Sequence, residues 1–240
     1  MKQLLFLIST FLLIASCETS DDSGIEEKEN ESSYTEYFYP TDSLVPFIYV
    51  FQNVNKPLDE KVHRIYRLES PQDTSLVVEY YNSNLTITEG YTHSIKDDFK
   101  VTDHMIVDGD GKKRKAKLSS NTFFPTYKDE QIQFVSDFPS HLDSITMIYQ
   151  SKRRFLEKKT VKVLGKDVPA IIVEDSVKVL FVNPFNKKSS SQKVMIARTF
   201  AKGYGMVRWS ANNEEIVYEL DKILSNEWWE EFGQSPQINP

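Results

Sequence analysis

The fold is decided by the stretch TVKVLGKDVPAIIV, residues 160–173. Short apolar runs lie on both sides of Gly165-Lys166-Asp167, a pattern typical of two antiparallel strands joined by a tight turn. Pro169 has no N–H group to donate, so we expect it at the start of a strand or at a sheet edge. The stretch therefore predicts a β-hairpin.

Similar runs rich in Val, Ile, Tyr, Phe and Thr fill the chain beyond Tyr34, and polar or glycine-containing breaks separate them. Strands are expected at 46–51, 62–68, 76–81, 85–92, 104–108, 112–118, 121–125, 131–138, 160–164, 168–173, 177–182, 193–200, 204–210 and 215–223. No regular helical crossover separates them, which excludes a doubly wound α/β fold. The predicted fold class is mainly β: a single curved antiparallel sheet, either a half-barrel or a split sandwich, with a short C-terminal helix.

Residues 140–158 allow two interpretations. Their apolar residues fit a helical stripe, but Ile145, Met147 and Tyr149 also alternate as they would in a strand. The β-branched residues in this segment favour the strand.

The expected C-terminal helix begins after a cap at Ser225 or Asn226 and ends at Gly233. Trp228 and Phe232 lie four residues apart and so share one helix face. We expect this face to fasten the helix to the sheet.

The N-terminus has a charged start at Lys2 and an almost wholly apolar segment from Leu4 to Ala15. Twelve helical residues rise roughly 18 Å, too short for a hydrocarbon core of about 30 Å, and this is typical of a secretory signal peptide. The segment ends in Ile14-Ala15-Ser16-Cys17, which resembles the lipobox of bacterial lipoproteins. The resemblance implies diacylglycerol on Cys17, cleavage before it, and further acylation of the new amino group.

The resemblance divides the chain into three parts: a lipoprotein signal peptide at 1–16, a lipidated cysteine and acidic disordered tether at 17–33, and an antiparallel β domain at 34–240. Residues 18–33 contain seven acidic residues and one basic residue. Such a run cannot bury a core, and its charges repel one another. It is also similar to the surface-export signal of Bacteroidota lipoproteins, which implies the outer membrane. The alternatives are a periplasm-facing anchor and a simple spacer.

Composition and motifs exclude several kinds of chemistry. The 240 residues have a net charge of −6 and contain one cysteine, which argues against a nucleic-acid binder and against an internal disulfide. A G-x-S-x-G string is absent, and the four histidines at 63, 93, 104 and 141 lie at least eleven residues apart. Asp108-Gly-Asp110-Gly111 has the wrong residues after it for a calcium loop and predicts a hairpin turn. We therefore expect no catalytic, metal-binding or cofactor-binding residues and no cofactor; the protein is predicted not to be an enzyme.

Two basic clusters and one aromatic run remain. The clusters lie at 112–117 and 152–162, and they predict solvated strand faces and lysine-protected edges, or else a patch for an anionic partner. The aromatic run Tyr34, Tyr37, Phe38 and Tyr39 is expected to attach the first strand to the core, or else to form a binding platform.

The segment 145–223 contains Lys152-Arg-Arg-Phe155, the hairpin at Gly165, Asn183-Pro184 and the glycine-rich turn Ala201–Val207. It resembles half-barrel proteins of bacterial envelopes, including lipoprotein-carrier folds. The resemblance rests on turn sequences and implies no active-site residues.

The function expected from this pattern is that of a membrane-anchored accessory or structural component of an envelope protein complex. The alternative is a half-barrel carrier for an apolar ligand such as lipid, and an enzyme of unknown class is a third. A carrier cavity would be lined by the most apolar strand residues: Ile171, Val173, Val177, Val179, Phe181, Met206 and Trp209.

Overall fold

A computed structural model describes residues 33–71, 73–127, 130–139, 145–183, 185–186 and 188–233. Chain contacts separate a first unit, Met1–Glu31, from a second, Ser32–Pro240. The predicted signal peptide, Cys17 and all but the last residue of the predicted tether lie outside the described residues. In the part of the chain that is described, no helix has the length and apolar character that crossing a bilayer demands.

The second unit is built almost entirely of strands, with a 3₁₀ turn (η1) before them and a short helix (α1) with a π-helical turn (η2) after them. The bounds are η1 Tyr34–Tyr37, β1 Phe47–Asn53, β2 Lys56–Glu69, β3 Thr74–Tyr81, β4 Ile87–Ser94, β5 Val101–Val107, β6 Lys113–Lys115, β7 Lys117–Asn121, β8 Ile132–Pro139, β9 Thr146–Val163, β10 Lys166–Val182, β11 Ser189–Ala201, β12 Gly205–Ala211, β13 Ile216–Leu224, α1 Asn226–Trp228 and η2 Trp229–Gly233.

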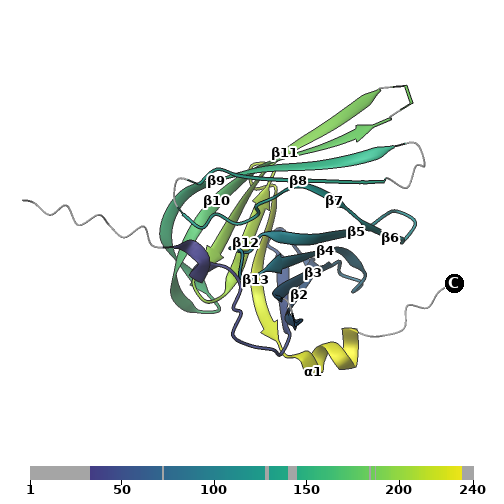
Figure 1. Cartoon of the computed structure of the whole chain (residues 1–240). Coiled ribbons are helices and arrows are strands. Elements are labelled where there is room, and N and C mark those ends of the chain that lie inside the picture. Colours follow the sequence, from purple (N-terminus) through teal and green to yellow (C-terminus); the bar gives the residue numbers. More distant parts are fainter. Residues whose placement is uncertain are drawn as a thin grey trace, which may run out of the picture. The chain divides into compact units, whose positions relative to one another are not determined.

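All the described strands belong to one curved antiparallel sheet (Figure 1), in the order β6-β5-β4-β3-β2-β1-β13-β12-β11-β10-β9-β8-β7. Each half of the chain is a meander of neighbouring strands. The two meanders meet where β1 pairs with β13, from Ile48 opposite Leu224 to Asn53 opposite Tyr218. The prediction of a mainly β fold with a single curved antiparallel sheet is confirmed, and the sheet is not split into a sandwich.

The two ends of the sheet are linked to each other. Only Ala116 separates β6, at one end, from β7, at the other, and its N–H donates to the His104 carbonyl at 2.8 Å. A 2.9 Å hydrogen bond also joins His104 Nδ1, on β5, and the Ser136 hydroxyl on β8. These contacts draw the ends together and give the sheet a concave interior.

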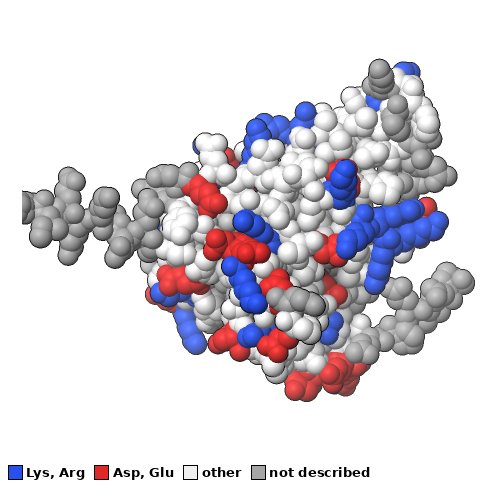
Figure 2. All heavy atoms as spheres, in the orientation of Figure 1, with Lys and Arg blue, Asp and Glu red and all other residues white. Residues whose placement is uncertain are grey.

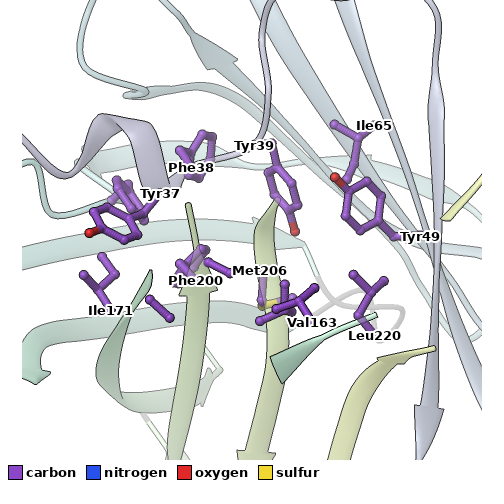
Figure 3. Close-up of a cluster of buried hydrophobic side chains, with 14 of the residues drawn as sticks. Tyr37, Phe38, Tyr39, Tyr49, Ile65, Val163, Ile171, Phe200, Met206 and Leu220 are labelled. Carbon is purple, nitrogen blue, oxygen red and sulfur yellow. The ribbon is translucent and has the colours of Figure 1, made fainter. Parts of the chain in front are cut away.

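Buried aromatic and aliphatic side chains fill much of this interior (Figure 3). The segment that begins with η1 supplies Tyr34, Tyr37, Phe38 and Tyr39, none of which is more than 7% exposed. The Phe38 ring lies 4.4 Å from that of Phe99 and 4.9 Å from that of Phe124, between centroids. The aromatic run therefore attaches the start of the domain to the core, as expected, although it forms a turn and loop.

Strand β1 is buried on both faces, which explains its uninterrupted apolar sequence FIYVF. Tyr49 and Phe51 join the interior core, whereas Ile48 and Val50 face a second cluster on the other side of the sheet. Trp229 closes that second cluster and is 4% exposed.

The C-terminal helix has the predicted position, with Ser225 at its N-cap. The expectation that Phe232 fastens it to the sheet is wrong, because Phe232 is 47% exposed. Trp229 packs on the sheet instead, with its ring 4.7 Å from that of Tyr81. Trp228 lies beside it, partly buried against the same cluster.

The ambiguous segment is a strand from Thr146 onward, which confirms the favoured interpretation; residues 140–144 lie outside the described part. The strand expected at 121–125 is wrong, because β7 ends at Asn121. Phe124 after it is fully buried, so this loop is held by packing and not by strand pairing.

Candidate functional site

Three charged side chains meet on the concave face of the sheet. Arg153 on β9 and Asp175 on β10 are directly opposite in the register, and Arg198 comes from β11. Arg153 donates from Nε to Asp175 Oδ1 at 2.5 Å and from Nη2 to Oδ2 at 2.8 Å. Arg198 forms an ion pair with the same carboxylate, and Arg153 Nη1 also donates to the Phe123 carbonyl.

This arrangement places two guanidinium groups on one carboxylate in the protein interior. The side chains of Arg153 and Asp175 are 2% and 0% exposed, and that of Arg198 is 17% exposed. Burial lowers the pKa of Arg153 to about 10, and burial followed by the nearby Arg153 lowers the pKa of Arg198. Both remain cationic at neutral pH, so the three side chains carry a net positive charge.

This cluster was not predicted from the sequence, and Arg153 was expected on a solvated strand face. That expectation is wrong because alternation on β9 turns Ser151, Arg153 and Phe155 inward and their neighbours outward. The same signal was present at Asp175, two residues from Val173 and Val177, both buried. In the sequence, each of these charged residues occupies a position where the strand alternation predicts an inward-facing side chain.

A cavity of about 220 Å³ lies against Arg198 on the concave face. Most of its wall is aromatic, and strands β2, β3, β4, β9, β11 and β12 all contribute to it. The lining residues are Lys61, His63, Tyr80, Tyr81, Thr88, Glu89, Tyr91, Phe123, Tyr149, Ile196, Arg198, Met206 and Trp209. We call this cavity the concave pocket.

One wall of the concave pocket carries Glu89, whose carboxylate is already engaged. Glu89 Oε1 accepts from the Tyr91 hydroxyl at 2.5 Å and lies 2.9 Å from His104 Nε2. The His104 ring stacks on Tyr91 with centroids 4.3 Å apart. These contacts fix the position of Glu89, the only carboxylate among the described residues of the pocket lining.

His63 is a second polar group in the wall. It is 3% exposed, and its Nδ1 has no hydrogen-bond partner among the described residues. Burial lowers its pKa to about 3, with a smaller contribution from the charge of Arg198. His63 is therefore a neutral imidazole, which offers one donor and one acceptor nitrogen.

The histidines expected to be isolated are buried strand residues at positions 63, 93 and 104, whereas His141 lies outside the described residues. Burial lowers the pKa of His93 to about 4. Among the described residues, no group of three His, Cys, Asp or Glu side chains is arranged to hold a metal ion.

The residues proposed to line a carrier cavity have different positions. Met206 and Trp209 line the concave pocket. Ile171, Val173 and Val177 are packed in the protein interior, and Val179 and Phe181 are partly exposed.

The two basic clusters lie mainly on the surface. Lys112, Lys113, Lys115 and Lys117 are exposed around the β5–β6 hairpin, where Figure 2 shows a group of basic side chains. Arg114 Nε donates to Asp108 Oδ2 at 2.8 Å. The Asp108 carboxylate also accepts from two backbone N–H groups within the turn, so the prediction of a hairpin turn is confirmed.

Comparisons with known proteins identify no family. No protein-family model matches the chain, and no curated protein sequence matches it. A protein described as a putative lipoprotein from Parabacteroides distasonis ATCC 8503 is 9% identical, with a TM-score of 0.46, over 78% of this chain and 98% of its own. A putative exported protein with a YmcC-like fold from Bacteroides fragilis NCTC 9343 is 12% identical, with a TM-score of 0.37, over 78% of this chain and 99% of its own. Both TM-scores are below 0.5, so we base function on the residues themselves.

Proposed function

We propose that this chain is a non-catalytic lipoprotein, anchored through Cys17 to the outer membrane, that serves as an accessory component of an envelope protein complex. The anchor is supported by the lipobox-like sequence Ile14–Cys17. The accessory role is supported by an open sheet edge on the folded domain.

The open edge is the first half of β11. On one side of β11, β10 pairs with every residue from Ser189 to Ala201. On the other side, β12 pairs only with the β11 residues Ile196–Ala201. From Ser189 to Met195, no described strand pairs with the second side, and most of these side chains are exposed. In Figure 1 this part of β10 and β11 projects beyond the rest of the sheet. Free N–H and C=O groups along such an edge can pair with a strand of another protein.

A second open edge in the same sheet is protected by charged side chains. Strand β8 pairs with β9 only as far as Arg153, so residues 154–163 have no described strand on that side. This edge carries Lys158, Lys159 and Lys162, and charged lysines discourage pairing with another strand. The Ser189–Met195 edge has one lysine, Lys193, and three consecutive serines. It is therefore the edge better suited to strand addition.

The filled interior supports an accessory role over lipid transport. The aromatic segment Tyr34–Tyr39 occupies part of the concave face, the concave pocket measures about 220 Å³, and two larger cavities of about 470 and 500 Å³ are lined mainly by polar and charged side chains. Cavities for larger organic ligands are usually about 300–1,000 Å³. The partners of this domain would then be recognised at its surface.

Photocrosslinking in intact cells tests the proposal. A photoreactive amino acid at Gln192, on the open edge, should give a discrete adduct with an envelope protein. The same amino acid at Lys159, on the protected edge, is the matched control and should give none. Ser190→Lys/Gln192→Lys should abolish the complex, whereas Ser190→Thr/Gln192→Thr should keep it. Identical adducts at both positions, or none at Gln192, would exclude docking at this edge.

A further inference from the structure

We infer that the concave pocket is a binding site for a small carboxylate with a ring-shaped body, such as an aromatic acid or a sugar acid. This inference does not rest on the accessory role, because it concerns the interior of the sheet and not its edge.

The charge balance behind the pocket favours an anionic ligand. The carboxylate of Asp175 is shared by Arg153 and Arg198, so one positive charge has no buried counterion of its own. A buried charge without a full partner is costly in a protein interior. Arg198 is the member of this cluster that lines the pocket. A guanidinium has five N–H donors in a planar fork, which matches the geometry of a carboxylate.

The other charged groups of the pocket wall have ion-pair or hydrogen-bond partners of their own. Lys61 lies 3.5 Å from Asp59, and Glu89 is held by Tyr91 and His104. Arg198 is thus the group that a ligand anion would approach. The Glu89 carboxylate has acceptor capacity left, and it would suit a ligand hydroxyl group.

The unpartnered Nδ1 of His63 favours a ligand with a polar group. Its imidazole is almost completely buried, so leaving Nδ1 without a hydrogen bond costs free energy that a ligand could recover. His63 is neutral and can therefore donate to a ligand oxygen or accept from a hydroxyl without adding charge.

The size of the pocket and the aromatic character of its wall suit a ligand with one ring. Tyr80, Tyr91, Phe123, Tyr149 and Trp209 supply ring surfaces on which a flat ligand can stack. A cavity of about 150 Å³ is enough to hold benzene. A volume of about 220 Å³ therefore accommodates one ring with a carboxylate, whereas it is too small for a membrane lipid. The exposed residue Thr88 lies in the lining and marks the rim of the pocket.

Binding can be measured on the full chain carrying Cys17→Ser, by calorimetry and thermal melting. The probes are 4-hydroxybenzoate and glucuronate, each compared with its neutral counterpart, 4-hydroxybenzamide or glucose. At least one acid should bind and raise the melting temperature, and its neutral counterpart should not. Which acid binds distinguishes an aromatic ligand from a sugar ligand. Failure of both acids, or equal binding of the neutral compounds, would overturn the inference.

Substitutions locate the binding in the pocket. Arg198→Gln should weaken the acid by roughly tenfold or more, the size expected for a hydrogen bond to a charged group. Arg208→Gln is the matched control, because Arg208 is outside the pocket lining and pairs with Glu214 and Glu219. Equal affinity in wild type and Arg198→Gln would overturn the inference.

A second pair of variants avoids any change to the buried cluster. Thr88→Glu adds a negative charge at the rim and should weaken the acid several-fold, whereas Thr88→Gln has the same shape without the charge. If both variants bind like the wild type, the acid is not in the concave pocket and the assignment fails.

Discussion

Arg153 and Asp175 face each other across β9 and β10, with Nε donating to Oδ1 at 2.5 Å and Nη2 to Oδ2 at 2.8 Å. Arg198 joins the same carboxylate from β11. One acidic side chain therefore holds three neighbouring strands together through charge, at a position where the interior is otherwise largely apolar and aromatic.

Asp175→Asn should destabilise the domain strongly. The substitution leaves two buried guanidinium groups without a counterion, and breaking a buried ion pair in this way costs about 3–5 kcal/mol. Glu174→Gln, one residue away, is the control, because Glu174 pairs with the exposed side chain of Arg154. The control should lose at most about 1 kcal/mol. Urea unfolding measures both, and similar losses would contradict a structural role for the cluster.

Gly205→Ala should be more damaging than Gly203→Ala. Gly205 has a φ of +78° and Gly203 a φ of +75°, so alanine at either position introduces a similar backbone strain. A Cβ on Gly205 would also clash with the Tyr39 ring, whereas nothing lies within 4 Å of a Cβ on Gly203. We expect an additional loss of about 1–3 kcal/mol in Gly205→Ala, from overpacking. Equal melting temperatures for the two variants would show that Tyr39 does not press on this turn.

Stability should fall as the pH is lowered from about 6.5 towards 4. Burial holds the pKa of His63 at about 3 and that of His93 at about 4, both below the ordinary value of 6.5. In this window the unfolded chain binds protons that the folded domain excludes, so acid favours unfolding by about 1 kcal/mol per pH unit for each histidine.

His63→Gln should reduce this pH dependence. The variant lacks one titrating group, so its difference in stability from the wild type should narrow as the pH falls. Urea unfolding at pH 7 and pH 5 measures the two slopes. If the slopes are the same, His63 is not excluded from protonation in the folded state.

Cys17→Ser should release the protein from the membrane fraction, because the proposed anchor is the lipid on this cysteine. Fractionation and labelling with a palmitate analogue measure the effect, with Ser16→Ala as a control that keeps small residues in the lipobox. Retention of Cys17→Ser in membranes would contradict the anchor.

Replacing Glu18, Asp21 and Asp22 with Ala should in addition hide the protein from protease added to whole cells if these acids direct surface exposure.

The purified Cys17→Ser chain should carry no phospholipid. The concave pocket has room for about one ring, and Tyr34–Tyr39 fill another part of the concave face. Native mass spectrometry and organic extraction test this expectation, and melting in the presence of phospholipid provides a second measurement. Stoichiometric lipid in the extract would favour the carrier hypothesis over the accessory role.

The fold was largely predictable because its turns are local. Gly165 and Gly203 mark tight connections whose chemistry can be recognised from a few residues, and the runs between them alternate as strands do. The pairing of β1 with β13 could not be predicted in this way, since it joins segments far apart in the sequence. Trp229 was not predicted as the residue that packs on the sheet, because Trp228 and Phe232 lie four residues apart and so also share one helix face.

The candidate site was less predictable than the fold. Arg153 lies in the basic run Lys152-Arg-Arg, and a run of charges is usually solvated. Its burial depends on Asp175, which becomes its neighbour only when β9 and β10 pair. The pocket also takes residues from six strands, so no local pattern in the sequence marks it.

The central position of β1 has a consequence for the order in which the domain can assemble. Among the described strands, Phe47–Asn53 is the first to be synthesised, whereas its partner β13 is the last. If the chain crosses a membrane N-terminus first, the β1–β6 meander has an apolar edge, FIYVF, that stays unpaired until the whole domain has emerged. Pairing over such a sequence separation is slow, and an unpaired edge favours aggregation. We therefore expect β1 to be the segment that a holding chaperone protects during export.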